Sequence, residues 1–132
     1  MKILITGCHG QLGTELQKQL ADEECALGPL PERLRKATVI AVDVDELDIT
    51  DREATVTYIR RTQPDTVINC AAFTNVDGCE TNRDAAYRVN ALAPRNLALA
   101  ADALGAKMVQ FSTDDVFAKA SHHPYNEFDA PA

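Results

Sequence analysis

The chain has 132 residues, of which 45% are apolar and 25% are charged, a composition typical of one globular domain. Its net charge of −7 argues against nucleic acid as a partner, because most of the surface would repel a polyanion. No apolar stretch reaches the length of a membrane span, and Met1 is not followed by a basic leader segment. The sequence therefore predicts a cytoplasmic protein without membrane contact. The four cysteines form no C-x-x-C pair, so it predicts no metal site.

The apolar pattern predicts four short strands and three helices. Each strand is an uninterrupted run of apolar, largely β-branched residues, which is typical of strands buried on both faces. The expected strands are residues 2–6, 38–42, 66–70 and 107–112. The expected helices are residues 11–22, a helix that starts at a capping box over 50–53 and runs to about 62, and residues 83–104.

Glycine and proline residues mark the interruptions of this pattern. Gly28 and Pro29 predict an irregular excursion over residues 23–36 that includes a short helical turn. Pro94 lies inside the last expected helix and should kink or divide it, because proline lacks the amide hydrogen. Gly105 is expected to cap the C-terminus of that helix.

The alternation of strands and helices predicts an α/β fold with a doubly wound parallel sheet of the Rossmann-like type. Right-handed crossovers would place helices on both faces of this sheet. With the four strands numbered along the chain, we expect the strand order 3-2-1-4.

Three glycines follow the first strand with the spacing G-x-x-G-x-x-G. Gly7 would permit a tight turn, Gly10 would let the backbone approach phosphate groups, and Gly13 would let the helix pack closely on the strand. The helix N-terminus would offer free amides and a partial positive charge to a pyrophosphate. The alternative is a plain strand-to-helix turn that tolerates glycine. Because the loop joins a strand directly to a helix, we expect it to bind a nicotinamide dinucleotide.

An acidic residue at the end of the second strand is the usual hydrogen-bond acceptor for the adenosine ribose. Asp43 and Asp45 both follow that strand, and Asp43 is nearer its end. Its separation from the glycine loop exceeds the usual spacing of about 20 residues, because the excursion over 23–36 lengthens the connection. A carboxylate at this position would repel a 2′-phosphate, which favours NADH over NADPH. The alternative is a solvated acidic loop.

Small side chains end the third strand, at Cys70, Ala71 and Ala72. At the carboxyl edge of a parallel sheet they would leave room for a flat ligand. Tight packing against neighbouring elements explains the same residues equally well.

Four segments together resemble the dTDP-4-dehydrorhamnose reductases, a family within the extended short-chain dehydrogenase/reductases. The segments are GCHGQLG (7–13), ELDITD (46–51), PDTVINCAAFTNVD (64–77) and STDDVF (112–117). The resemblance spans nearly all of this chain but only the N-terminal part of a typical, much longer member. The family reduces the 4-keto group of a dTDP-linked deoxysugar with NADH or NADPH, which completes dTDP-L-rhamnose.

The resemblance implies a role for residues in every segment. Cofactor-binding residues would be Gly7, Gly10, Gln11, Leu12, Gly13, Asp43, Asp48, Ile49, Ala71, Ala72, Phe73 and Thr74. Of these, residues 10–12 would contact the phosphates, Asp48 and Ile49 would border the adenine, and residues 72–74 would line the nicotinamide side. Thr113 would be the hydroxyl residue of the family's catalytic Thr/Ser-Tyr-Lys set, and Thr113 with Asp114 would contact the sugar. In that set the tyrosine donates a proton to the ketone oxygen.

The sequence departs from the family pattern in two places. None of Tyr58, Tyr87 and Tyr125 has a lysine four residues later, so the Tyr-x-x-x-Lys pair of the family is absent. Asp115 stands where the family usually has tyrosine. We therefore expect residues 1–132 to form an incomplete NAD(P)-binding Rossmann domain that lacks the C-terminal substrate domain and is inactive alone.

Two functions of different classes remain open at this point. The first is the cofactor-binding part of a reductase whose partner is a nucleotide-sugar substrate. The second is a non-catalytic dinucleotide-binding module or a regulatory subunit of the same fold. The missing tyrosine and lysine fit both functions, and homo-oligomerisation is compatible with either.

Overall fold

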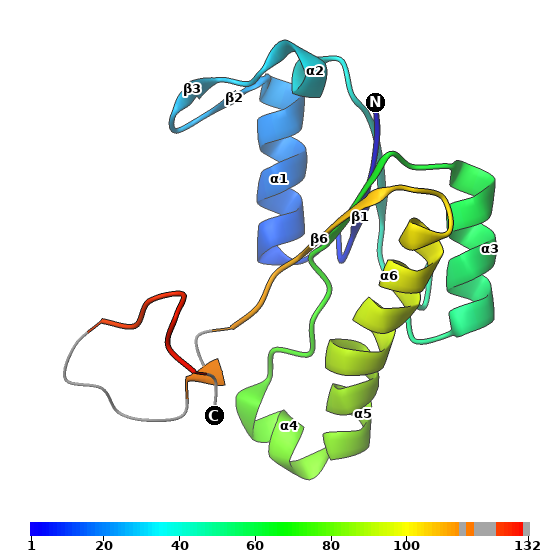
Figure 1. Ribbon diagram of the computed structural model, residues 1–132, viewed down its shortest axis with the longest axis vertical. Helices are drawn as coiled ribbons and strands as arrows, with labels where there is room; N and C mark the ends of the chain where they lie inside the picture. The colour runs from blue at the N-terminus through cyan, green and yellow to red at the C-terminus, as the bar shows by residue number, and fades with distance from the viewer. Residues whose placement is uncertain (114–115, 118–123, 131–132) are drawn as a thin grey trace.

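The computed structural model describes residues 1–113, 116–117 and 124–130 (Figure 1). Its strands are β1 (Lys2–Thr6), β2 (Glu24–Cys25), β3 (Gly28–Pro29), β4 (Thr38–Val42), β5 (Thr66–Asn69) and β6 (Lys107–Gln110). Its helices are α1 (Gln11–Asp22), α2 (Glu32–Arg35), α3 (Arg52–Thr62), α4 (Val76–Thr81), α5 (Arg83–Tyr87) and α6 (Ala93–Asp102), with the π-helical turn η1 (Arg88–Leu92) between the last two. Each predicted strand and helical region is present, and the excursion over 23–36 forms the β2–β3 hairpin and α2.

The main sheet has four parallel strands in the order β4-β1-β5-β6, which confirms the predicted fold class. The strand order within that class needs correction. With these strands numbered along the chain, the order is 2-1-3-4 rather than 3-2-1-4. The third strand, β5, pairs with β1 instead of extending the sheet beyond β4. The chain was expected to cross to the other side of β1 only after its third strand. It does so after its second strand, so the winding direction reverses between β1 and β5.

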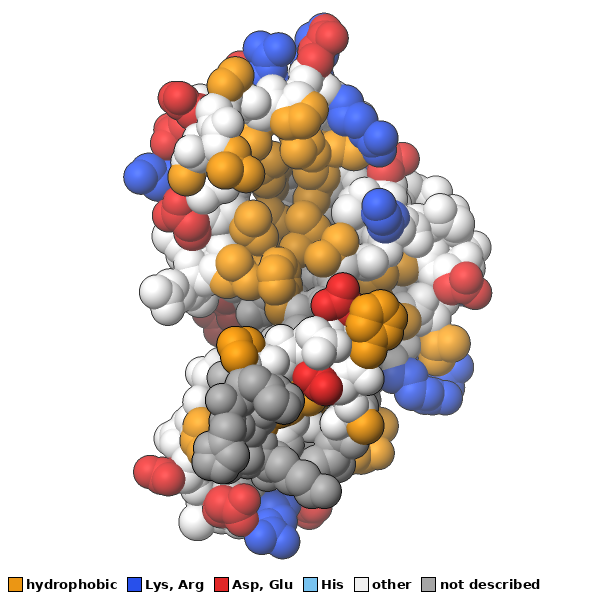
Figure 2. Space-filling view, turned by 60° about the vertical axis from the view of Figure 1, so that its left-hand side comes forward, with side chains coloured by type: hydrophobic (Ala, Val, Ile, Leu, Met, Phe, Trp, Pro, Cys, Tyr) orange, Lys and Arg blue, Asp and Glu red, His pale blue; other side chains and the backbone are white. Residues whose placement is uncertain are grey.

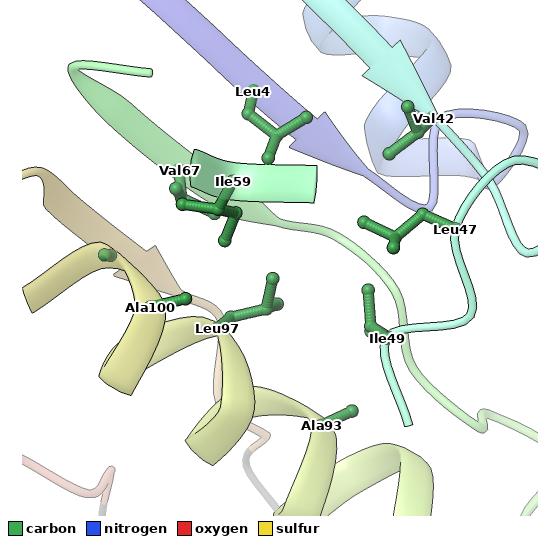
Figure 3. Close-up of a cluster of buried hydrophobic side chains, with 10 residues drawn as sticks. Leu4, Val42, Leu47, Ile49, Ile59, Val67, Ala93, Leu97 and Ala100 are labelled. Carbon is green, nitrogen blue, oxygen red and sulfur yellow. The ribbon is translucent and has the colours of Figure 1, made fainter. Parts of the chain in front are cut away.

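The helices on the two faces explain this reversal. α1 lies on one face of the sheet, and α3 and α6 lie on the other (Figure 1). A right-handed crossover through a helix on the opposite face must lead the chain back past β1, so β5 lies on the far side of β1 from β4. The main core lies between the sheet, α3 and α6 (Figure 3). Its central side chains, Leu4, Ile59, Val67 and Leu97, are fully buried.

The other face of the sheet is covered less completely. Side chains alternate along a strand, so Ile3, Ile5 and Ile68 point away from the face that carries Leu4 and Val67. Ile3 and Ile5 are buried, whereas Ile68 is only partly buried. Figure 2 shows a broad band of hydrophobic side chains on the side of the molecule that carries α1.

The predicted capping box at the start of α3 is wrong by one residue. Asp51, not Thr50, is the N-cap, and its carboxylate accepts a hydrogen bond from the Ala54 amide at 3.0 Å. Thr50 is engaged elsewhere, because its amide and hydroxyl both donate to Oδ1 of Asp48. An aspartate is as good a cap as threonine, so the sequence alone could not decide between neighbouring candidates.

The last long helix is divided, as the proline predicted. Pro94 lies in the first turn of α6, where its missing amide hydrogen costs no intrahelical bond. Gly105 has a φ of +67°, and its amide donates to the Asp102 carbonyl at 2.9 Å, as expected of a C-terminal cap. The short helix α4 was not predicted. It begins at Asn75, whose side chain accepts a hydrogen bond from the Gly78 amide.

Candidate nucleotide-binding cleft

Two glycines of the loop after β1 are required by the local backbone. Gly7 has a φ of +68°, and a Cβ at this position would lie 2.6 Å from the Ala71 amide nitrogen. A Cβ on Gly13 would overlap the Gly7 carbonyl oxygen and would lie 2.8 Å from the Cα of Cys8. The tight turn at Gly7 and the close helix packing at Gly13 are thus confirmed.

The N-terminus of α1 points a set of backbone amides at this loop. Gly10 is its N-cap, and no side chain caps the helix there. An uncapped helix N-terminus leaves amide donors without intrahelical acceptors and carries a partial positive charge. Such a terminus has the chemistry that binds an anion, and phosphate above all.

A cleft of about 250 Å³ opens beside the glycine loop, at the carboxyl ends of β1, β4 and β5. It lies at the point where the winding direction of the sheet reverses, the position where α/β sheets bind ligands. Among the predicted cofactor-binding residues, those that line it are Gly7, Gly10, Asp43, Asp48, Ile49, Ala71 and Ala72. Those that do not line it are Gln11, Leu12, Gly13, Phe73 and Thr74, which lie within three residues of Gly10 or Ala72 in the chain. Cys70, one of the small residues expected to leave room for a flat ligand, also lines it, and several lining residues were not predicted, among them Thr6 and Val89.

Asp43 forms one wall of the cleft and is tied to the glycine loop. Its Oδ2 accepts a hydrogen bond from the His9 amide at 2.9 Å, and its Oδ1 accepts one from the Val44 amide at 2.9 Å. These two amides hold the pKa of Asp43 below its usual range, so the carboxylate is charged at neutral pH. Asp45, the alternative candidate, is exposed and does not line the cleft.

The segment Asp48-Ile49 is fixed by partners on both sides. The hydroxyl and amide of Thr50 donate to Asp48 and lower the pKa of its carboxyl group. The Ile49 carbonyl accepts a hydrogen bond at 3.1 Å from the side chain of Asn96, which is only 5% exposed. Sequence reasoning missed Asn96, because its partner lies far away in the chain.

Asn69 connects three strand ends beneath the cleft. It is 1% exposed, and its Oδ1 accepts hydrogen bonds from the Thr6 hydroxyl at 2.6 Å and from the Ala71 amide at 3.2 Å. Its Nδ2 donates to the Gln110 side chain at 2.7 Å. The ends of β1, β5 and β6 are thereby held together, and Ala71 is held at the cleft wall.

Asn90 holds the next segment of the cleft rim. Its Oδ1 accepts from the Phe73 amide at 2.8 Å, and its Nδ2 donates to the Phe73 carbonyl at 3.1 Å. Asn90 lies in the π-helical turn η1, a kind of irregularity that is frequent at functional sites.

Thr113, the predicted catalytic hydroxyl, is exposed and follows β6 at the same edge of the sheet. Asp114, predicted to contact the sugar, and Asp115 lie outside the described residues. Among residues 1–113, 116–117 and 124–130, no helix has the length and apolar character needed to cross a bilayer.

The sheet, the glycine turn and the cleft at its winding reversal define a Rossmann-like α/β domain. More specifically, the chain belongs to the family described as "RmlD substrate binding domain", which matches residues 1–132.

Named relatives agree with this assignment. The dTDP-4-dehydrorhamnose reductase of Mycobacterium tuberculosis (strain CDC 1551 / Oshkosh) is 39% identical over 135 residues, which covers 99% of this chain and 40% of the relative. A crystal structure of a dTDP-4-dehydrorhamnose reductase from Clostridium acetobutylicum superposes with a TM-score of 0.89 at 46% identity, covering 100% of this chain and 43% of that one. The Bacillus anthracis enzyme, crystallised with NADP, gives 0.86 at 37% identity, covering 99% and 42%. This chain therefore spans about 40% of the length of the relatives that it matches.

Proposed function

We propose that this chain is the cofactor-binding part of an NAD(P)H-dependent reductase in dTDP-rhamnose biosynthesis. The reaction would be reduction of the 4-keto group of a dTDP-deoxysugar, from dTDP-4-dehydrorhamnose to dTDP-L-rhamnose. The observation that carries the proposal is the cleft, where a glycine loop, an uncapped helix N-terminus and a charged aspartate meet. Relatives named for this reaction support the choice of substrate.

Each wall of the cleft has a task in this proposal. Gly10, Gln11 and Leu12 would contact the pyrophosphate. Gln11 and Leu12 would donate backbone hydrogen bonds from the first turn of α1, and Gly10, its N-cap, would let the phosphates approach the backbone. Asp43 would accept hydrogen bonds from the adenosine ribose. Asp48 and Ile49 would border the adenine.

The opposite end of the cleft would hold the reacting groups. Residues 72–74 would line the nicotinamide side. Asn90 would fix the backbone of this segment at Phe73, and Asn69 would fix it at the preceding residue, Ala71. The bound dinucleotide supplies the hydride for the ketone carbon, while the ketone oxygen gains a proton. Thr113 would hold that oxygen by a hydrogen bond, and Thr113 with Asp114 would contact the sugar.

The proposal extends to the choice of cofactor. NADH or NADPH fits the family, and the Asp43 carboxylate favours NADH because its charge would repel a 2′-phosphate. The glycine loop and α1 carry no Lys or Arg between residues 7 and 17 that would attract one.

Dinucleotide binding is tested most directly through the fluorescence of NADH itself, because the chain contains no tryptophan to interfere. We expect saturable binding by the wild type and weaker binding, by about tenfold or more, by Gly10→Val, whose side chain would fill the cleft. Lys18→Ala, an exposed change on the same helix, is the matched control and should bind normally. Equal binding by Gly10→Val and the wild type would contradict the assignment of the loop.

The alternative, a binding module without catalysis, differs in one measurement. We would join this chain to the C-terminal portion of the Clostridium acetobutylicum relative and follow NADH oxidation that depends on dTDP-4-dehydrorhamnose. Reductase activity in the chimera, absent from that C-terminal portion alone and reduced in Thr113→Ala, would support the reductase. A folded chimera that binds NADH but never oxidises it would favour the module.

A further inference from the structure

The glycine loop and the end of β4 bring three potential metal ligands together. The Sγ of Cys8, a ring nitrogen of His9 and a carboxylate oxygen of Asp43 all lie within 4.8 Å of one another. Nδ1 of His9 and Oδ2 of Asp43 are 3.7 Å apart. The sequence did not predict this cluster, because its members are not arranged in a metal-binding spacing.

These separations are close to those of a tetrahedral zinc site. Bonds of about 2.0 Å to nitrogen or oxygen and about 2.3 Å to sulfur place neighbouring ligands about 3.3–3.8 Å apart. The histidine–aspartate pair already has this separation. The Cys8 Sγ would have to approach the other two ligand atoms by at most about 1.3 Å, the difference between 4.8 Å and a tetrahedral sulfur–nitrogen or sulfur–oxygen separation of about 3.5 Å. The His9 side chain is 68% exposed, so its rotation can bring the ring nitrogen closer to the thiol.

We propose that Cys8, His9 and Asp43 form a binding site for Zn²⁺, with the fourth coordination position open to water. Zinc suits this mixed set of sulfur, nitrogen and oxygen ligands, and three protein ligands with one open position are a common zinc arrangement.

Two of the three ligands are already held in place. The Asp43 carboxylate is oriented by the His9 and Val44 amides, one on each oxygen. Cys8 is 7% exposed, and its amide donates to the Val42 carbonyl at 3.1 Å, which fixes it against the end of β4. Such outer hydrogen bonds orient metal ligands and strengthen binding.

The thiol must lose its proton when the metal binds. Burial and the negative charges of Asp43 and Glu46 raise the pKa of Cys8, so the free site holds a neutral thiol. The groups that face it are Asp43 and Glu46 together with His9 of the loop.

The site overlaps the cleft proposed for the dinucleotide. Both ligands would use the Asp43 carboxylate, which lines the cleft together with Gly7 and Gly10. Zinc should therefore compete with NADH. This last step rests on the proposed function, whereas the metal site itself does not.

Cobalt replaces zinc at such sites and reports a thiolate ligand by a charge-transfer absorption band. We expect one equivalent of Co²⁺ to give this band, added Zn²⁺ to remove it, and calorimetry with Zn²⁺ alone to give one site. Cys8→Ser should abolish the band, and His9→Ala should weaken zinc binding by about tenfold or more. Cys25→Ser, on β2, and the double variant His122→Ala/His123→Ala are controls that should bind like the wild type.

The His9→Ala variant changes an exposed side chain, so it keeps the test valid if Cys8→Ser fails to fold. Undiminished zinc affinity in His9→Ala, or the absence of the band in the wild type, would overturn the site. The competition is tested separately by NADH titration with and without Zn²⁺. We expect zinc to weaken NADH binding in the wild type but not in His9→Ala. Normal NADH binding that zinc leaves unchanged would overturn the competition, and no NADH binding without zinc would instead contradict the proposed function.

Discussion

The carboxylate of Asp43 accepts a hydrogen bond from the backbone amide of His9, at 2.9 Å, which joins the end of β4 to the glycine loop. The same side chain is only 22% exposed and forms one wall of the cleft. Any ligand that enters the cleft along the loop must therefore meet a fixed negative charge. If the cleft holds a dinucleotide as proposed, this charge lies where it would act on the adenosine ribose and on any 2′-phosphate.

The first prediction concerns Asp43→Asn. The amide oxygen can still accept from His9, so the loop should keep its place, but the charge that repels a 2′-phosphate is removed. We expect the ratio of the NADPH and NADH dissociation constants to fall by about tenfold, or about 1.4 kcal/mol. Fluorescence titrations with both cofactors measure it. Asp45→Asn is the matched control, because Asp45 is exposed outside the cleft. An unchanged ratio in Asp43→Asn would show that this charge does not select the cofactor.

Much of the cleft could be predicted because parallel strands end at one edge of their sheet. Thr6 pairs with Val42 and with Asn69, so the residues that follow these three strands must converge. This reasoning predicts that Gly7, Asp43 and Ala71 lie close together, and it needs no knowledge of the strand order. It identifies the edge of the sheet at which the cleft lies, but it does not give the order of the strands in the sheet.

The parts that could not be predicted depend on long-range pairing. The hydrogen bonds of Asn69 to Thr6 and Gln110 need β1, β5 and β6 to be neighbours, which the predicted strand order did not provide. The contacts of Asn90 with Phe73 and of Asn96 with Ile49 likewise join segments far apart in the chain. An asparagine in a helix gives no local signal of such a partner, because its side chain can also be solvated or act as a cap.

The second prediction concerns the stability provided by Asn69. Asn69→Ala leaves the buried Thr6 hydroxyl and the Gln110 side chain without their partner. We expect a loss of about 1–3 kcal/mol in the free energy of unfolding, the usual result of an unsatisfied buried polar group. Urea unfolding followed by circular dichroism measures this loss. Gln19→Ala, whose side chain bonds only to Glu15 on the helix surface, should change stability by less than about 0.5 kcal/mol. Similar effects of both changes would contradict a special role for Asn69.

The third prediction concerns the link between Asn90 and the cleft rim. Asn90→Ala removes both hydrogen bonds to Phe73, so the Phe73 amide should exchange with solvent about tenfold faster, equivalent to about 1.4 kcal/mol. Asn90→Asp keeps the hydrogen-bond acceptor but loses the donor, so its Phe73 exchange rate should lie between those of the wild type and Asn90→Ala. Hydrogen exchange measured by NMR reports this amide directly. Asn82→Ala is the control, because the Asn82 side chain bonds locally to Gly78 and Thr81. An unchanged exchange rate in Asn90→Ala would mean that other contacts hold this segment.

The last prediction concerns acid. Hydrogen bonds from the His9 and Val44 amides lower the pKa of Asp43, and those from the Thr50 hydroxyl and amide lower the pKa of Asp48. A folded pKa below the unfolded value means that both groups stabilise the fold fully above the unfolded pKa of about 3.9. This stabilisation is lost as the pH falls from there through the lower folded pKa values. The double variant Asp43→Asn/Asp48→Asn lacks both groups and should lose less stability over the same range.

Urea midpoints measured from about pH 6 to about pH 2 test this difference, since they follow the proton uptake of the two states. The difference in urea midpoint between the wild type and the double variant should become smaller as the pH falls below about 4, where Asp43 and Asp48 of the wild type begin to be protonated. Asp45→Asn is again the control, and its urea midpoint should change with pH in the same way as that of the wild type. A gap that stays constant across the range would mean that the hydrogen bonds at Asp43 and Asp48 do not favour the charged carboxylates in the folded state.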